Sequence, residues 1–212
     1  MKLFSNFVSS ASYRVRIALN LKGIAYEYVP IDANNEGHLA PEYLAVNPQG
    51  LIPSLVDGDH VLTQSLAIIE YLEETHPEPP FLPADPVERA RVRALALVPN
   101  CEMHPVNNRR IREYIVNDLD LGRDTMIEWM GNWNAKGFAT LEAMLSDNPH
   151  TRAFCHYDQP TLADIYLVPQ LNVARRFETD VSSYPTLLKI EKACLALPEF
   201  DAARPENQPD AA

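Results

Sequence analysis

The first eighty residues alternate between short β-prone runs and segments with helical periodicity. The β-prone runs occupy residues 2–5, 26–31, 53–56 and 61–63. A segment with apolar residues at helical spacing separates the first two runs, and another follows the last run. Gly23 suits the end of the first helix, and Gly58 suits the turn of a hairpin. The pattern therefore predicts the order β-α-β, a connecting segment, and then β-β-α.

A proline-rich stretch then interrupts the pattern. Five prolines lie between Pro77 and Pro86, and proline restricts both its own backbone and that of the preceding residue. Beyond it, helical spacing predicts long helices at 86–115, 123–147, 162–177 and 185–197, with kinks at Pro99 and Pro105. We therefore expect an α/β domain at 1–80 and an all-α domain at 86–212, with a loosely ordered tail after Pro198.

Composition and charge narrow the class of protein. The chain has 18 Lys and Arg against 29 Asp and Glu, a net charge of −11, which disfavours nucleic acid as a partner because its phosphates would be repelled. The apolar runs are too short to span a bilayer, and the N-terminal segment lacks the apolar stretch of a signal peptide. We expect a cytoplasmic protein that is not embedded in a membrane.

The three cysteines give no sign of a disulfide framework or a metal site. Cys101, Cys155 and Cys194 are odd in number and widely spaced, and none has a Cys or His neighbour at metal-ligand spacing. We expect three buried thiols and no bound metal.

The start of the first helix is a candidate anion site. A helix beginning near Ser10 presents free N–H groups and a partial positive charge beside Ser9 and Ser10. Serine is also a favoured helix cap, so the local sequence by itself favours a purely structural role for these residues.

A second candidate lies ahead of the helix that follows the hairpin. Ser65 is a natural N-cap, and Gln64 before it could hold a ligand carboxylate together with the free N–H groups of the helix. A cis bond before Pro53 would expose the Ile52 backbone to a peptide-like ligand, but X-Pro bonds are mostly trans and the sequence leaves this open.

A cluster of arginines stands out in the otherwise acidic second domain. Arg109, Arg110 and Arg112 are closely spaced. A solvated helix face is one interpretation. However, His104 and Asn108 are four residues apart and should share one helical face beside Arg109, which would form a polar and cationic surface.

Taken together, these motifs resemble the zeta class of glutathione transferases, the family that includes maleylacetoacetate and maleylpyruvate isomerases. The run SSASYRVRIAL at 9–19 is similar to the family's SSCSWRVRIAL, and QSLAIIEYLEE at 64–74 is intact. Further matches lie at 47–53 (NPxxxxP), 161–170 (TLADIYLVPQ) and 176–180 (RFxxD). The resemblance implies a thioredoxin-like domain followed by an all-helical domain, in a homodimer.

The resemblance also implies the site residues. Those expected to bind glutathione are Ser9, Ser10, Ala11, His38, Ile52, Pro53, Gln64, Ser65, His104 and Asn108. The two serines would adjoin the sulfur, and Gln64 with Ser65 would bind the γ-glutamyl carboxylate. Those expected to bind a substrate with two carboxylates are Arg109, Arg110 and Arg176, because arginine recognises carboxylates in bidentate fashion.

The implied activity is glutathione-dependent cis-trans isomerisation of a maleyl keto acid, maleylpyruvate or maleylacetoacetate, in aromatic catabolism. The glutathione thiolate would add to the double bond, allow rotation and then leave. Ser9, Ser10, Arg176 and His104 are the expected catalytic residues.

Two departures from the family pattern bear on the substrate. Ala11 replaces the usual Cys, and Val8 replaces a common Arg that would be an anchor for a substrate carboxylate. Two alternatives therefore stay open: glutathione conjugation or dehalogenation of small acidic electrophiles, and a non-catalytic interaction module with the same fold.

Overall fold

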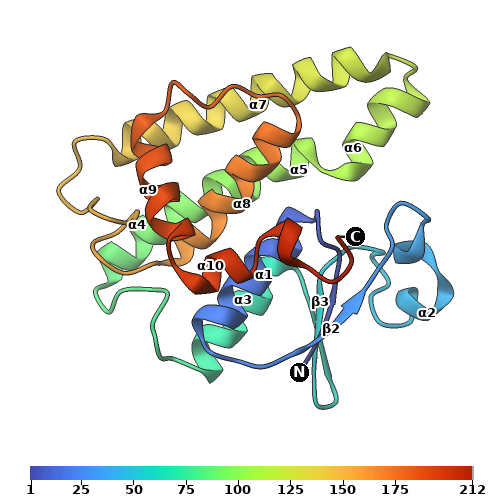
Figure 1. Cartoon of the computed structure of the whole chain (residues 1–212), viewed down its shortest axis with the longest axis horizontal. Helices are drawn as coiled ribbons and strands as arrows, with labels where there is room; N and C mark the ends of the chain where they lie inside the picture. Colours follow the sequence, from blue (N-terminus) through green and yellow to red (C-terminus); the bar gives the residue numbers. More distant parts are fainter. Residues whose placement is uncertain (212) are drawn as a thin grey trace. The chain divides into compact units, whose positions relative to one another are not determined.

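The computed structural model describes residues 1–211, and the chain forms two compact units (Figure 1). One unit contains Met1–Pro80 together with the C-terminal segment that begins at Leu195, and the other is Phe81–Cys194. The C-terminal segment thus belongs with the α/β part of the chain, and not with the helical domain to which the sequence pattern assigned it.

A four-stranded mixed sheet forms the centre of the first unit. Its strands are β1 (Lys2–Ser5), β2 (Glu27–Pro30), β3 (Ser54–Asp57) and β4 (His60–Thr63), in the order β2-β1-β3-β4. β1 runs parallel to β2 and antiparallel to β3, and β3 and β4 form a hairpin. Gly58 in that hairpin has a φ of +56°, which glycine adopts readily. The predicted β-α-β and β-β-α order is confirmed.

Two helices pack together beside this sheet. α1 (Ser10–Leu21) joins β1 to β2, and α3 (Ser65–Thr75) follows β4. Their apolar stripes are fully buried, with Ile17 and Leu72 at 0% exposure. The segment between β2 and β3 holds the 3-10 turn η1 (Gly37–Leu39) and the short α2 (Pro41–Leu44). This packing fixes the starts of α1 and α3, where the candidate residues lie.

The second unit is helical, but its first predicted helix is interrupted. Residues 86–118 form α4 (Pro86–Leu97), the π-helical turn η2 (Val98–Met103), α5 (His104–Asn107), α6 (Arg109–Glu113) and the π-helical turn η3 (Tyr114–Asp118). Pro99 lies in η2 and Pro105 in the first turn of α5, where the missing N–H is tolerated. Asn108 separates α5 from α6 with an extended ψ of 171°.

Three longer helices complete the second unit: α7 (Gly122–Leu145), α8 (Leu162–Arg176) and α9 (Pro185–Leu195). α8 starts with a capping box in which the Thr161 N–H donates to the buried carboxylate of Asp164. Within residues 1–211 no helix has the length and apolarity needed to cross a membrane.

The cysteine prediction is partly wrong. Cys155 and Cys194 are buried, but Cys101 is exposed. Cys101 lies in η2, whose buried side is formed by Pro99 and Met103.

The tail after Pro198 is more ordered than predicted. It contains α10 (Pro198–Ala202) and the 3-10 turn η4 (Pro205–Asn207). Phe200 is fully buried, and the buried Arg16 of α1 donates from Nε to the Ala203 carbonyl at 3.0 Å. Local sequence could not reveal these contacts, because their partners lie more than 180 residues away.

Candidate active site

Ser9 is the N-cap of α1. Its backbone is extended, with φ −70° and ψ 116°, and its Oγ accepts a hydrogen bond from the Ser12 N–H at 3.2 Å. Ser10 is the first helical residue and is buried, and Ala11 behind it is half-buried. Because the Ser9 oxygen accepts in the cap, its own hydroxyl proton can still be donated. Capping and anion binding are therefore compatible at this residue.

The start of α3 differs by one residue from the sequence prediction. Gln64, and not Ser65, is the residue at the N-cap position, with a φ of +68°, and Ser65 is the first helical residue. The Gln64 Nε2 donates to the Gln49 Oε1 at 2.9 Å. The Arg14 Nη1 lies 3.5 Å from the Ser65 Oγ, so this contact joins α1 to the start of α3.

Gln49 is a residue that the sequence analysis missed. Its backbone N–H donates to the Asn47 Oδ1 at 3.1 Å, in a turn that also contains Gly50. The only signal in the sequence was its place between Asn47 and Pro53 in the family-like motif. The structure brings two amide side chains, Gln49 and Gln64, together at the start of α3.

The segment leading to β3 is held by side-chain contacts to its backbone. The Ile52–Pro53 bond is cis, which answers the question that the sequence left open. The Leu51 carbonyl accepts hydrogen bonds from Asn47 Nδ2 at 2.7 Å and from the Tyr43 hydroxyl. His38 lies in η1 and is half-buried. All the predicted glutathione residues from the N-terminal part of the chain belong to the first compact unit.

His104 and Asn108 do not belong to one continuous helix, as their four-residue spacing was expected to place them. His104 opens α5, whereas Asn108 has left the helical conformation and caps α6. The Asn108 Oδ1 accepts from the Ile111 N–H at 3.2 Å, and its Nδ2 donates to the Pro105 carbonyl at 3.1 Å. The amide is therefore engaged in local structure, and the four-residue spacing does not describe a continuous helix.

The arginines of α6 occupy different environments. Arg109 forms an ion pair with Glu113, and Arg110 is exposed. The Arg112 guanidinium lies over the Phe177 ring at 4.4 Å from its centroid, and Arg176 lies over the same ring at 5.2 Å. The sequence analysis did not assign Arg112 to the substrate, but its guanidinium lies over the same ring as that of Arg176.

Electrostatics distinguish this pair from an ordinary surface pair. Burial lowers the pKa of Arg112 to about 10, and the positive charges of Arg176 and Arg109 add to the shift. Partial burial also lowers the pKa of Arg176. In the part of the chain that the structure describes, no carboxylate lies within ion-pair distance of either guanidinium. Two like charges near one ring favour an anionic ligand.

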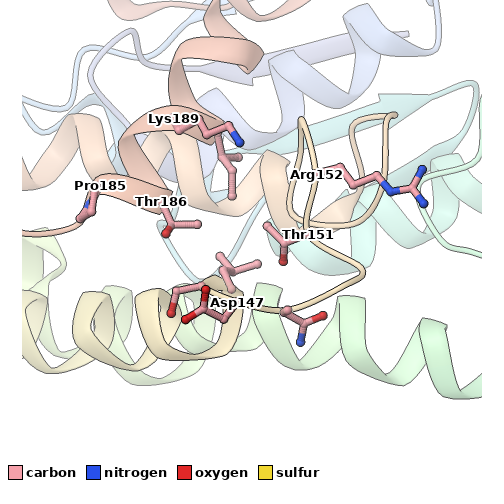
Figure 2. A pocket seen from close by; sticks show the side chains of 10 residues that line it. Asp147, Thr151, Arg152, Pro185, Thr186 and Lys189 are labelled. Carbon is pink, nitrogen blue, oxygen red and sulfur yellow. The ribbon is translucent and has the colours of Figure 1, made fainter.

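A pocket of about 390 Å³ opens elsewhere in the second unit, between the end of α7 and the start of α9 (Figure 2). Thr151, Thr186 and Lys189 line it, and Figure 2 shows Arg152 directed away from them. The Thr186 N–H already donates to a carboxylate oxygen of Glu142 at 2.9 Å. None of the predicted site residues lines this pocket.

Comparison with known proteins identifies the family. The family model for the glutathione S-transferase N-terminal domain matches residues 3–80. The maleylpyruvate isomerase of Ralstonia sp is 47% identical over the full length of both chains. The holo structure of a maleyl pyruvate isomerase, described as a bacterial glutathione S-transferase of the zeta class, superposes with a TM-score of 0.98 and 47% identity over 100% of both chains.

The chain belongs to the zeta class of glutathione transferases.

A second solved structure supports this assignment. The maleylacetoacetate isomerase of Methylobacterium extorquens AM1, with malonate and glutathione bound, matches with a TM-score of 0.96 and 43% identity over 100% of both chains. The fold of the zeta-class transferases, a thioredoxin-like domain followed by a helical domain, is thereby confirmed for this chain. Across residues 1–211 no cluster of three or more His, Cys, Asp or Glu side chains could hold a metal ion.

Proposed function

We propose that this zeta-class protein is a glutathione-dependent isomerase that converts a maleyl keto acid to its fumaryl isomer, in aromatic catabolism. The observation that carries the proposal is its full-length similarity to relatives named for this reaction, one of them solved with malonate and glutathione bound. Maleylpyruvate is the proposed substrate, because the Ralstonia relative and the holo structure bear its name. Maleylacetoacetate is the second candidate.

Glutathione is the proposed cofactor, and the start of α1 would hold its sulfur. Lowering a thiol pKa from about 8.5 to about 6.5 requires roughly 2.7 kcal/mol of preference for the thiolate. A helix N-terminus contributes about 0.3–1 kcal/mol, and one hydrogen bond to a charged group about 1.5–3 kcal/mol. The α1 N-terminus and the Ser9 or Ser10 hydroxyl together contribute about 1.8–4 kcal/mol, a range that includes this amount, whereas the helix N-terminus alone falls short.

The rest of glutathione would be bound by groups of the first unit that surround the starts of α3 and β3. Gln64 and Ser65 would bind the γ-glutamyl carboxylate, and Gln49 fixes the orientation of the Gln64 amide. His38 and the Ile52 backbone would hold the middle of the peptide. Ala11 has no thiol to offer, which the chemistry tolerates because glutathione supplies the sulfur.

The reaction would begin with conjugate addition. The thiolate forms a carbon–sulfur bond at the double bond, and the displaced electron pair moves to the ketone oxygen, which gives an enolate. The former double bond is now single and rotates. Collapse of the enolate forms the trans double bond, breaks the carbon–sulfur bond and releases the thiolate unchanged. No net oxidation or proton uptake occurs.

The arginines would stabilise the anions in this sequence. Arg176 and Arg112 would bind substrate carboxylates or the developing enolate, because two neighbouring guanidiniums without a carboxylate partner suit such charges. Arg109 and Arg110 would add to the positive field. His104 and Asn108 would border the bound ligands, and His104 would orient the substrate or relay a proton.

We propose a homodimer in the cytoplasm whose ligands are glutathione and a small dicarboxylate keto acid, with nucleic acid disfavoured by the net charge of −11.

The test is to follow the absorbance of maleylpyruvate and of maleylacetoacetate with purified protein, with and without glutathione. Glutathione-dependent loss is expected for at least one of them, and the two kcat/KM values rank the substrates. If the protein binds glutathione but consumes neither compound, glutathione conjugation to another small acidic electrophile replaces isomerisation as the function. Val8, in place of an arginine that would anchor a substrate carboxylate, would then indicate this different substrate. Failure to bind glutathione would favour a non-catalytic module.

A further inference from the structure

The C-terminal segment holds the loop that leads into the start of α1. The Phe7 N–H, between β1 and α1, donates to the Asp210 Oδ2 at 3.0 Å. The other carboxylate oxygen, Oδ1, accepts from the Tyr28 hydroxyl of β2 at 2.6 Å. Both oxygens of Asp210 are thus engaged, and the residue ties the loop to the sheet from a position near the end of the chain.

Arg16 strengthens the same connection from inside the fold. Its side chain is fully buried, and its Nε donates to the Ala203 carbonyl at 3.0 Å. Its Nη groups donate to the carbonyls of Asn6 at 3.3 Å and of Phe7 at 3.1 Å. Burial lowers the pKa of Arg16, and the charge of Asp210 acts in the opposite direction. One buried guanidinium therefore joins the loop to the C-terminal segment.

These contacts determine where Ser9 lies. The Asn6 carbonyl also accepts from the Ser9 N–H at 3.1 Å. The N–H of Phe7 and the carbonyls of Asn6 and Phe7 are consequently all bound, two of them by Arg16 and one by Asp210. Figure 1 shows the C-terminal segment, with α10, alongside α1. Residues distant in sequence therefore fix the backbone of Ser9, whose hydroxyl is the proposed hydrogen-bond donor to the thiolate.

We propose that Asp210 is a positioning residue for the glutathione thiolate. By holding the Phe7 N–H, it keeps the Ser9 hydroxyl and the N-terminus of α1 directed at the sulfur. This inference rests on the proposed function, because the sulfur is that of the proposed cofactor.

The test compares Asp210→Ala with the matched control Glu206→Gln. Glu206 lies in the same segment and pairs with Arg204, so its substitution removes one negative charge without touching the loop. Two quantities are measured on the full-length variants: hydrogen exchange of the amides of residues 7–12, and the pKa of bound glutathione from the ultraviolet absorbance of its thiolate.

Asp210→Ala should accelerate exchange at residues 7–12 about tenfold to a hundredfold, the range for one lost hydrogen bond to a charged group. It should also raise the thiol pKa toward about 8.5, its unperturbed value. A pure charge effect has the opposite sign, because removal of a nearby carboxylate would stabilise the thiolate and lower that pKa. Asp210→Asn keeps an acceptor for the Phe7 N–H and should recover part of both effects, while Glu206→Gln should change neither.

The inference fails if Asp210→Ala exchanges like the wild type at residues 7–12, if exchange rises equally throughout the chain, or if the thiol pKa falls. Failure of the proposed function has a different signature. In that case wild-type protein leaves the glutathione thiol pKa at its free value, whereas the exchange result still reports whether Asp210 holds the loop.

Discussion

Ser9 combines a structural and a chemical role in one hydroxyl group, and substitution can separate the two. Alanine removes both the cap and the donor, whereas glycine caps nearly as well as serine but has no hydroxyl. We expect Ser9→Ala to lower the free energy of unfolding by about 1 kcal/mol and Ser9→Gly by only a few tenths. Both should raise the thiol pKa of bound glutathione. A loss of about 1 kcal/mol in both variants would contradict this expectation, and would show that the hydrogen bond from the Ser12 N–H to the Ser9 Oγ accounts for the whole effect of the cap.

Arg176 should act on the substrate and not on glutathione. Arg176→Gln should lower kcat/KM for isomerisation roughly tenfold to a hundredfold, the range for a lost hydrogen bond to a charged group, with glutathione affinity unchanged. Arg112→Gln should behave similarly if both guanidiniums bind the same anion.

The neighbouring Arg175 provides the control. Arg175 pairs with Glu191, a buried carboxylate, so Arg175→Gln should lower the melting temperature while leaving kcat/KM largely intact. Steady-state kinetics, glutathione titration and thermal unfolding of the three variants test this contrast. A parallel loss of glutathione binding and isomerisation in Arg176→Gln would contradict the assignment.

For individual residues, the sequence could predict those at the ends of helices, but not those whose contacts are with residues distant in the chain. Ser9 and Gln64 stand next to helix starts that periodicity reveals. Gln49 and Arg112 were not assigned to the site, because their importance depends on contacts with Gln64 and Phe177 that only the folded chain creates.

Among the elements, the interrupted helix from 86 to 118 shows why hydrophobic periodicity alone does not predict where a helix breaks. The two prolines predicted bends, but the break at Asn108 arises from a side chain that bonds to the backbone and competes with the helix. Periodicity predicted α7, α8 and α9 to within two residues, because their buried stripes run without such competition.

A buried ion pair joins the end of α1 to α3. The Lys22 side chain is fully buried, and its Nζ donates to the Glu73 Oε2 and the Pro79 carbonyl, each at 2.7 Å. Removing one partner of such a pair leaves a charge in a poorly solvated site, so Glu73→Ala should lower the free energy of unfolding by about 3 kcal/mol. The exposed neighbour Glu74→Ala should cost far less. Urea unfolding measures both, and equal small losses would mean that water compensates Lys22.

For the molecule as a whole, the lowered pKa of His156 predicts that the free energy of unfolding falls in acid. His156 is buried, and its Nδ1 accepts from the Arg91 Nη1 at 3.1 Å. Burial is the largest cause that lowers the pKa of His156, and the Arg91 charge adds to it. Glu88 acts in the opposite direction, while His150 adds to the lowering and stacks at 5.7 Å.

Proton binding by His156 is linked to the stability of the folded chain. Because the folded pKa lies below the unfolded value of about 6.5, the unfolded state binds the proton more readily. The contribution of the neutral His156 to the free energy of unfolding is therefore fully present above about pH 6.5, and it declines as the pH falls below that value. His156→Asn retains an acceptor for Arg91 but does not titrate, so it should flatten this decline. The exposed His60→Asn should not, and urea unfolding from pH 5 to 8 compares them. An unchanged pH dependence in His156→Asn would show that protonation of His156 does not cause the decline.

The division of the whole chain was predictable only in part. The proline-rich stretch near residue 80 predicted where the first unit gives way to the second, and the α/β and helical characters followed from periodicity. The return of the C-terminal segment to the first unit was not predictable, because it depends on Arg16 and Asp210 meeting groups far away in sequence.

In the proposed reaction glutathione is a catalyst and is not consumed. The most direct measurement is the amount of fumaryl product formed per glutathione, by nuclear magnetic resonance, with maleylpyruvate in large molar excess. We expect many product molecules per glutathione and full recovery of the free thiol. Product that stops at one equivalent, with glutathione converted to a stable thioether, would contradict isomerisation and establish conjugation.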